Sequence, residues 1–543
     1  MRRFSFIAVL FLCSLIFTGC ARQPREAGVH RITSGRDPST HDPAQAYDTT
    51  SMSTTRVLYR GLVDYGNGAD IVPAVAREYS ISPDGKTYSF KLRNDVRFHF
   101  DINGKSPGRR VVAEDFRYAI ERVLDPKTTS DGLSPFQIID GGKEYSEAKE
   151  KNPDAKIHVR GIRVQGEDEI SFTLTKTDLT FINWLTLPFA AAVPREWVEK
   201  IEAGDEEFSE HPNGCGPFRF VEWIHDSRLR IEKNPDYYDK SLPKANGLEL
   251  QIGGGDTLQM MRFELGDIDV YSLEETAAPD YLRLMRDEKW KGLIEHAPMM
   301  DVRYLCMNTE MEPFNNKLVR EAVSYAINKE RIISTQAGRI QDAKGILPPG
   351  MPGYNKNLQG YNYDPEKARA LLKQAGYKDG QPITLWYATM AWYPQAAQSI
   401  QQDLKQVGMT INLKSGNYGE VKTAASERKK IQLSILGWVQ DYPDPSNFLD
   451  LNLNSKAITQ TASLNRAFYS NVQVDKLMNA AAVELNRPLR LKMYSDAEQQ
   501  IMRDAPWVTL AHTERYVAHQ PWIEGYKLHP MWSARYEYVQ VNR

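Results

Sequence analysis

The stretch GWVQDYPDPSNFL at residues 437–449 holds the residues that are best suited to bind a charged ligand. It follows an alternating apolar segment that predicts a strand ending at Gly437 and contains Ile431, Leu433 and Ile435. The stretch is too irregular for a helix and too rich in proline for a central strand. Gly437 permits a close backbone approach, and Pro443 and Pro445 restrict the loop that follows. We therefore expect a rigid loop at the end of a strand.

Asp441 is the main candidate for ligand binding in this loop. Ligands of α/β proteins gather at strand ends, and a carboxylate there offers charge-assisted hydrogen bonds to an ammonium group. The alternative is that Asp441 is a turn or cap residue, as we expect of Asp444. Trp438 and Tyr442 either stack on a ligand or pack within the domain.

No catalytic pattern accompanies this loop. The sequence has no GxSxG, HExxH or P-loop motif, and its ten histidines are scattered. We therefore expect a binding protein without enzymatic activity, cofactor or metal ion.

The composition supports a large protein that does not bind nucleic acid. The chain has 543 residues, which predicts two or three domains. Its 68 Lys and Arg residues nearly balance 70 Asp and Glu residues, whereas nucleic-acid binders carry a basic excess. The 27 Tyr, 19 Phe and 10 Trp residues suit either large cores or an aromatic ligand cleft.

The N-terminus predicts export and lipid attachment. Two arginines precede an apolar run from Phe4 to Phe17, which is too short to span a membrane comfortably and indicates a signal peptide. The run ends in Phe17-Thr18-Gly19-Cys20, which resembles a bacterial lipobox, so Cys20 is expected to carry lipid and to anchor an extracytoplasmic protein. An ordinary signal peptide is the alternative. If the exported protein enters an oxidising compartment, Cys215 and Cys306 either form a disulfide with each other or stay free.

Other segments predict the elements that must position the loop. Residues 82–100 indicate a hairpin with Tyr88, Phe90 and Leu92 on one face. From about residue 300 strands and helices alternate, which predicts an α/β lobe. That lobe includes one amphipathic helix over 315–333, and a helix with Asp364 as N-cap, Pro365 at its first position and Gly376 at its end.

Collinear motifs of the chain resemble the solute-binding protein family 5 lipoproteins, the dipeptide- and oligopeptide-binding components of ABC importers. Besides the lipobox, the matching motifs are YSFKLRNDVRFH, VAEDFRYAIERV, GCGPFRFVEW, NPDYYD, ELGDIDV, MNTEMEPFNNKLVREAVSYAINKERI, YDPEKARALLKQAGY and GWVQDYPDPSNFL. They occur in the family's order over nearly the whole mature chain.

The resemblance implies an α/β, two-lobed periplasmic-binding-protein-like fold with an extra subdomain and a hinge of two strands, VRYLCMN and PWVTLAH. The implied segments are a signal peptide (1–19), a lipidated cysteine and tether (20–29), one lobe (30–70, 190–298 and 507–543), an inserted subdomain (71–189) and a second lobe (299–506).

The resemblance also implies roles for individual residues. Asp441 occupies the position that pairs with the ligand's α-ammonium in relatives, and Thr49 and Thr50 lie where relatives supply backbone contacts. Trp392 and Tyr393, with Trp386, follow a strand and either line the pocket or pack the core.

One departure from the family concerns the ligand's carboxylate. Some peptide-binding relatives hold it with an arginine near the end of the 431–436 strand or in the loop after residue 386. Those places carry Ile435 and the run ATMAWY here, which argues against a dipeptide clamped at its C-terminus. Longer peptides, backbone-held peptides or another ligand are favoured.

The expected function is therefore capture of peptides, most naturally oligopeptides, by a monomeric lipoprotein that delivers them to the permease of an ABC transporter. The alternatives are a non-peptide solute, namely an oligosaccharide, a nickel chelate or haem, and a role as an envelope peptide sensor or chaperone.

Overall fold

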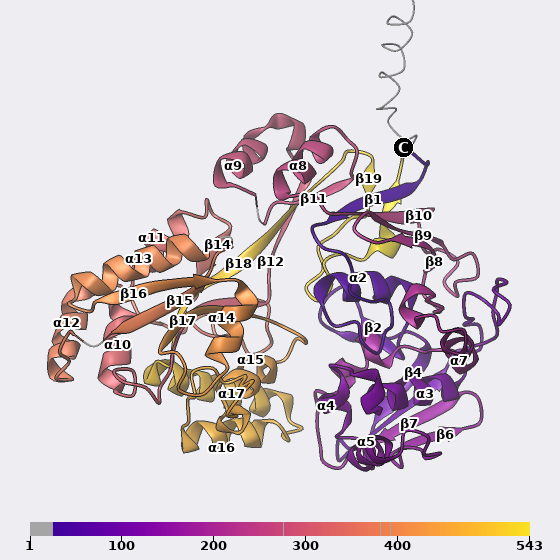
Figure 1. Ribbon diagram of the computed structural model, residues 1–543, viewed down its shortest axis with the longest axis horizontal. Helices are drawn as coiled ribbons and strands as arrows, with labels where there is room; N and C mark the ends of the chain where they lie inside the picture. Colours follow the sequence, from indigo (N-terminus) through magenta and orange to yellow (C-terminus); the bar gives the residue numbers. More distant parts are fainter. Residues whose placement is uncertain (1–24, 275, 381, 391) are drawn as a thin grey trace, which may run out of the picture.

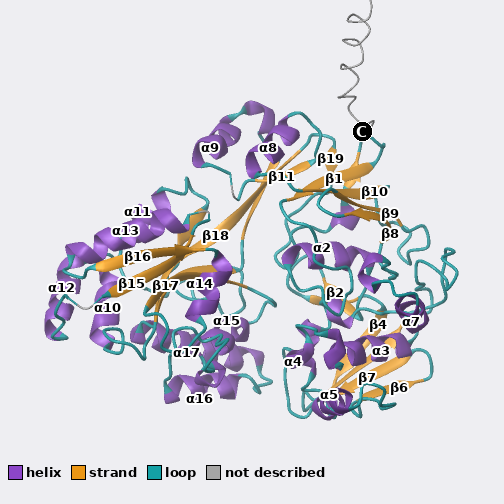
Figure 2. Cartoon of the chain, viewed as in Figure 1, coloured by secondary structure: helices purple, strands orange, loops and turns teal. Residues whose placement is uncertain are grey.

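The computed structural model describes residues 25–543 except 275, 381 and 391. The chain forms two lobes, both of mixed helix and strand (Figure 1 and Figure 2). We call lobe I the half that carries α2 (Thr49–Leu58), α3 (Ala113–Leu124) and β1 (Val29–Ser34), and lobe II the half that carries α10 (Lys317–Ala326), α13 (Tyr393–Gln406) and α17 (Arg487–Asp504). The predicted signal peptide and Cys20 lie outside the described residues. Within the described part of the chain, no helix is long and apolar enough to cross a membrane.

Lobe I contains two four-stranded sheets. The first has the order β1-β10-β9-β8, in which β1 is parallel to β10 and the other pairs are antiparallel. Its strands are β1 (Val29–Ser34), β8 (Phe218–Ile224), β9 (Arg228–Lys233) and β10 (Gly247–Ile252). The second is antiparallel with the order β4-β5-β7-β6, formed by β4 (Ala76–Ile81), β5 (Thr87–Leu92), β6 (Ile162–Gln165) and β7 (Glu169–Thr173).

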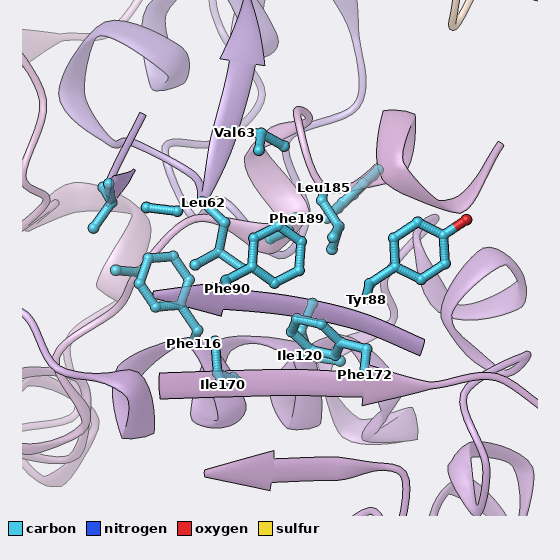
Figure 3. Packing of buried hydrophobic residues seen from close by; sticks show 14 of the residues in the cluster. Leu62, Val63, Tyr88, Phe90, Phe116, Ile120, Ile170, Phe172, Leu185 and Phe189 are labelled. Atoms are coloured by element: carbon cyan, nitrogen blue, oxygen red, sulfur yellow. The ribbon is translucent and has the colours of Figure 1, made fainter. Parts of the chain in front are cut away.

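The second sheet of lobe I packs against α3 (Ala113–Leu124), as Figure 3 shows. Alternation along β5 points Tyr88, Phe90 and Leu92 to one buried face, as expected. The hairpin is present as the antiparallel pair β4–β5, but it spans residues 76–92 and not the predicted 82–100. Phe116 and Ile120, one helical turn apart on α3, are both about 1% exposed and belong to the same core. Tyr47, in the loop that leads into α2 (Thr49–Leu58), packs against this core.

Lobe II is built on a mixed sheet of order β11-β18-β13-β17-β15-β16, with β12 and β14 also paired to β18. The strands are β11 (Val270–Ser272), β12 (Ile294–Pro298), β13 (Asp301–Met307), β14 (Ile340–Asp342), β15 (Ile383–Ala388), β16 (Ile411–Gly416), β17 (Leu433–Val439) and β18 (Trp507–His519). β18 is long enough to pair with β13 at its start and with β12 and β11 at its end. It therefore runs from lobe II towards lobe I (Figure 1).

Helices cover both faces of this sheet. Leu305 and Ile435 face a core formed with α10 (Lys317–Ala326), α12 (Pro365–Gln374) and α13 (Tyr393–Gln406). Tyr304 and Leu436 face the opposite core, formed with α14 (Tyr418–Ala425), α15 (Pro445–Leu453), α16 (Val472–Ala481) and α17 (Arg487–Asp504). Both faces of β13 and β17 are buried, and successive side chains of a strand point to opposite faces. Neighbouring residues of these strands therefore pack against different layers of helices.

Shorter elements complete the chain. They are β2 (Val63–Tyr65), β3 (Ile71–Pro73), α4 (Leu133–Phe136), α5 (Gly142–Lys151), α6 (Phe181–Trp184), α7 (Arg195–Ala203), α8 (Asp256–Glu264), α9 (Ala278–Arg286), α11 (Lys329–Ser334), β19 (Ile523–Glu524) and β20 (Gln540–Val541).

Two secondary-structure predictions need correction. The helix expected over 315–333 is divided into α10 and α11, because Ile327 is extended and Asn328 caps a new helix by accepting a hydrogen bond from the Arg331 N–H. The 437–449 stretch contains regular structure after all. Residues 437–439, with which the stretch begins, are the last residues of the central strand β17. Pro445 is the first residue of α15, a position at which a helix tolerates proline.

Other local predictions hold. Asp364 caps α12 by accepting from the Lys367 N–H, Pro365 is the first residue of α12, and Gly376 has a positive φ of 67° just after the helix. Cys215 and Cys306 are both free and buried, so the alternative of a disulfide between them is wrong. The domain boundaries stay a prediction.

Candidate functional site

The loop after β17 lies between the two lobes. β17 is paired with β13 along its whole length, whereas β15 pairs only with Leu433 and Ser434. From Ile435 onwards, no described strand pairs with the β15-side edge of β17. The loop that follows contacts lobe I through the Gln440 side chain, which donates to the Pro530 carbonyl over 2.8 Å, and through Tyr442, whose ring centroid lies 5.6 Å from that of Trp184.

Asp441 is a partly buried carboxylate that receives hydrogen bonds but no cation from the described residues. Its Oδ1 accepts from the Tyr47 hydroxyl of lobe I over 3.0 Å, and its Oδ2 accepts from Asn447 Nδ2 over 3.0 Å. Burial raises the pKa of Asp441, although these two hydrogen bonds act in the opposite direction. Among the described residues, no Lys, Arg or His forms an ion pair with Asp441, so the site is suited to a cationic group from outside the chain.

Asp444, three residues further on, is a structural residue by contrast. Its Oδ1 accepts from the Ser446 N–H and thereby caps α15. Arg490 of α17 binds both of its oxygens, over 2.6 and 2.7 Å. The cap and the bidentate pair occupy this carboxylate fully, in line with its expected role in the turn.

Asn447 organises the loop, and sequence reasoning missed it. This residue is fully buried at the start of α15. Its Oδ1 accepts from Trp438 Nε1 over 3.0 Å and from the Asp441 N–H over 3.1 Å, while its Nδ2 donates to Asp441. One amide side chain thus fixes both the tryptophan ring and the carboxylate. An asparagine in the first turn of a helix that begins with proline was the only available signal.

Gly437 is a glycine because of a neighbouring side chain. A Cβ on Gly437 would lie 2.5 Å from Nη1 of Arg303, which is its cross-strand partner on β13. Arg303 Nη1 donates to the Tyr393 hydroxyl over 3.1 Å, and the Arg303 Nε lies 3.1 Å from Asp301 Oδ2. The close backbone approach expected at Gly437 is therefore made by an arginine of the same lobe.

The other candidates occupy three different places. Thr49 and Thr50 are the first residues of α2, separated from Tyr47 by the N-cap Asp48, and are at least partly accessible. Trp392 is 8% exposed and Tyr393 is 2% exposed, and both belong to the core beneath α13. Tyr442 is 5% exposed beside Trp184. Their contact with a ligand stays a prediction.

Tyr47 and Arg303 were also missed by sequence reasoning. Tyr47 precedes a helix whose cap, Asp48, is recognisable, yet nothing local shows that its hydroxyl reaches the opposite lobe. Arg303 belongs to the motif VRYLCMN, whose strand pattern gives no sign that its side chain reaches across to Gly437 of β17. No group of three or more His, Cys, Asp or Glu within the described ranges is placed to hold a metal ion.

Comparison with known proteins decides the family. Residues 70–460 match the model of the bacterial extracellular solute-binding proteins, family 5. The chain belongs to this family. Family 5 is a family of binding proteins and not of enzymes, and the resemblance noted from the sequence motifs is confirmed.

Individual relatives of this family 5 protein carry different names. It is 28% identical to di/tripeptide-binding protein 2 of Pseudomonas aeruginosa, over 99% of both chains. It is 30% identical to heme-binding protein A of Haemophilus influenzae, over 91% of this chain and 88% of that protein. It also matches the solved structure of the periplasmic binding protein DppA of Helicobacter pylori in complex with the peptide STSA, with a TM-score of 0.77, 27% identity and coverage of 95% and 98% of the two chains.

These matches confirm the expected fold class, an α/β periplasmic-binding-protein-like fold, over nearly the whole chain. The names of the relatives include both peptide-binding and heme-binding proteins.

Proposed function

We propose that this family 5 protein captures short peptides between its lobes and delivers them to the permease of an ABC importer, with Asp441 binding the peptide's α-ammonium group. The observation that carries the proposal is the partly buried carboxylate of Asp441, which has hydrogen-bond donors from both lobes and no cation within the described residues. An ammonium ion supplies the missing charge and forms hydrogen bonds about twice as strong as neutral ones.

The free edge of β17 supports a peptide as the ligand. Beyond Ser434 the β15-side edge of this strand has no described strand partner, and an extended peptide can add to such an edge through main-chain hydrogen bonds. Trp438, on this strand, is partly exposed and could stack on a peptide side chain, whereas Tyr442 is buried beside Trp184. Peptide-binding names among the relatives, such as the dipeptide-binding protein of Escherichia coli at 29% identity, favour the same ligand class.

The proposal includes the cellular setting. Export by the signal peptide and lipid attachment at Cys20 would hold a monomeric protein at the membrane that contains its permease. Binding without chemistry suits a protein that releases its ligand unchanged, so no cofactor is required.

Two measurements test the ligand. Native mass spectrometry of the purified protein should show added masses that match short peptides, and calorimetry should show binding of trialanine but far weaker binding of N-acetyl-trialanine. Equal affinity for the two compounds would refute the role of Asp441. Binding of neither compound by protein freed of endogenous ligand would refute the peptide proposal.

Haem is the second candidate because of the relative at 30% identity. Its propionate groups carry negative charge, and the unpaired Asp441 carboxylate would repel them in the same site. Titration with haemin distinguishes the two, since a saturable Soret shift together with no affinity for trialanine would establish haem as the ligand.

A further inference from the structure

Arg303 is a partly buried cation at the proposed peptide site whose role sequence reasoning did not identify. We infer that Arg303 binds the C-terminal carboxylate of the peptide and so restricts the ligands to short peptides with two free termini. This inference rests on the proposed function and deepens it, because it names which peptides the site selects.

The position of Arg303 follows from the register of the sheet. β13 and β17 are antiparallel, with Arg303 opposite Gly437 and Asp301 opposite Val439. Since Gly437 has no side chain, the guanidinium of Arg303 lies directly over the backbone of β17 at the point where β15 no longer covers that strand. A peptide that adds to this edge would pass beside the guanidinium.

The hydrogen-bonding capacity of Arg303 is only partly used. Nη1 donates to the Tyr393 hydroxyl, and Nε faces Asp301 at 3.1 Å but is a buried atom without a hydrogen bond. Nη2 donates to no acceptor within the described part of the chain, and the side chain keeps 21% of its surface exposed. A planar guanidinium with a free edge matches a carboxylate, which can accept two parallel hydrogen bonds.

Asp301 does not cancel the charge of Arg303 completely. Its Oδ1 accepts from the Thr513 N–H over 2.8 Å, and its Oδ2 accepts from the Thr513 hydroxyl over 2.9 Å. Two donors from β18 therefore already stabilise this carboxylate. Tyr393 and Tyr418, the other groups near the guanidinium, bring hydroxyl groups and no carboxylate. An anionic ligand would complete the set of partners.

The spacing along β17 limits the length of the ligand. Gly437, beneath Arg303, and Asp441 are four residues apart, and a fully extended chain advances at most about 3.6 Å per residue. The distance along the chain between the two positions is therefore at most about 14 Å. A peptide that reaches the carboxylate with its ammonium group and the guanidinium with its carboxylate has on the order of two to four residues.

A purely structural role is the competing explanation, since Arg303 also contacts Asp301 and Tyr393. Arg331 of α11 offers a matched control, because it is likewise a lobe II arginine paired with a fully buried aspartate side chain, that of Asp403, and it lies outside the site. If both arginines are structural, replacing either one lowers the melting temperature and leaves ligand preference unchanged.

The experiment compares trialanine with its C-terminal amide by calorimetry, using purified wild type, Arg303→Gln, Arg303→Lys and Arg331→Gln. We expect wild type and Arg331→Gln to prefer the free acid by at least roughly 30-fold, which is about 2 kcal/mol. Arg303→Gln should bind both forms equally, at the affinity that wild type has for the amide. Arg303→Lys should retain part of the preference, because lysine keeps the positive charge but lacks the planar guanidinium that can donate two parallel hydrogen bonds to a carboxylate.

The outcomes separate this inference from the proposed function. A wild type that binds both forms equally, or an Arg303→Gln variant that still prefers the free acid, would overturn the role of Arg303 while peptide capture stands. Binding of neither form by wild type would overturn both. If Arg303→Gln is too unstable to assay, the double variant Asp301→Asn/Arg303→Gln removes the opposite charges together and must also lose the preference.

Discussion

At the scale of single residues, the two aspartates of one loop have different roles because their partners differ. Asp444 is bound by Arg490 and caps α15, whereas the donors that the described residues supply to Asp441, from Tyr47 and Asn447, are neutral. A carboxylate that is buried without a cation costs free energy in the unliganded protein and gains most from a cationic ligand. A binding aspartate can therefore be told from a structural one only when the hydrogen-bond and ion-pair partners of its carboxylate are known.

Replacing Asp441 by Asn should weaken trialanine binding by at least roughly 100-fold, because one partner of a buried charge pair is lost. The melting temperature should not fall, since the unpaired charge disappears. In wild type the raised pKa of Asp441 means that it takes up a proton at a higher pH than an ordinary aspartate does. Peptide affinity should therefore decrease as the pH is lowered, and the variant should lack this dependence.

Calorimetry at several pH values tests this prediction together with thermal unfolding. An Asp441→Asn variant that binds trialanine as wild type does, with the same pH profile, would contradict it.

Replacing Asn447 by Ala should disturb the loop by removing one side chain that holds both Trp438 and Asp441. The buried donors and acceptors left unpaired should cost on the order of 2–4 kcal/mol of stability, and peptide affinity should fall at least tenfold. Asn452 provides the control, because it is a buried residue on the same helix whose Nδ2 donates to the backbone carbonyls of Asn447 and Phe448 and not to the side chains of Trp438 or Asp441. Asn452→Ala should lower stability alone, and equal losses of affinity in the two variants would argue against a specific role for Asn447.

At the scale of elements, α17 contributes both to the site and to the pH dependence of folding. Its Arg490 holds Asp444, and its Glu498 accepts hydrogen bonds from the backbone N–H groups of Ile346 and Leu347 over 2.8 and 2.9 Å. Both bonds go to the same oxygen of Glu498, which is 1% exposed, and burial raises its pKa to about 7. The helix thus fixes the 346–347 segment through a carboxyl group that favours its neutral form.

Glu498 should make the protein less stable as the pH rises. Because the folded protein holds this proton up to about pH 7 and the unfolded chain releases it near an ordinary glutamate pKa, stability falls between these two pH values. Glu498→Gln keeps the accepting oxygen and removes the ionisation. It should be more stable than wild type above pH 7 by on the order of 2–3 kcal/mol.

Chemical denaturation at pH 5 and pH 8 measures this difference. Asp496→Asn, on the more exposed side of the same helix, should leave the pH dependence as in wild type. A Glu498→Gln variant with the pH dependence of wild type would show that another group is responsible.

At the scale of the whole molecule, the lobes meet through the loop that carries Asp441. Tyr47 is placed by lobe I, with its ring centroid 5.8 Å from that of Phe189, while its hydroxyl reaches Asp441 of lobe II. β18 and the β12–β13 segment connect the lobes at the other end. A ligand held between the lobes would therefore stabilise their contact, as in hinge closure.

Tyr47→Phe removes only the hydroxyl that joins the lobes. Trialanine affinity should fall about tenfold, because a hydrogen bond to a charged group is lost from the closed state. Small-angle scattering should show a larger radius of gyration for the unliganded variant than for unliganded wild type. Tyr363→Phe, which alters an exposed tyrosine of lobe II, should change neither value; identical behaviour of the two variants would exclude a role of Tyr47 in closure.

Local patterns in the sequence determined much of this protein. The period-two alternation in β5, the caps of α12 and the collinear motifs were enough to predict the fold class, the family and Asp441 as a candidate. These features depend on neighbouring residues, whose backbone preferences and hydrogen bonds act over a few positions.

Only the tertiary structure decided how the site is assembled. The absence of an arginine at position 435 argued against a bound carboxylate, yet the register between β13 and β17 places Arg303 over Gly437. Likewise, Tyr47 reaches Asp441 only because the two lobes meet. These contacts join residues far apart in the chain, so strand pairing and lobe packing determine them and no local propensity encodes them.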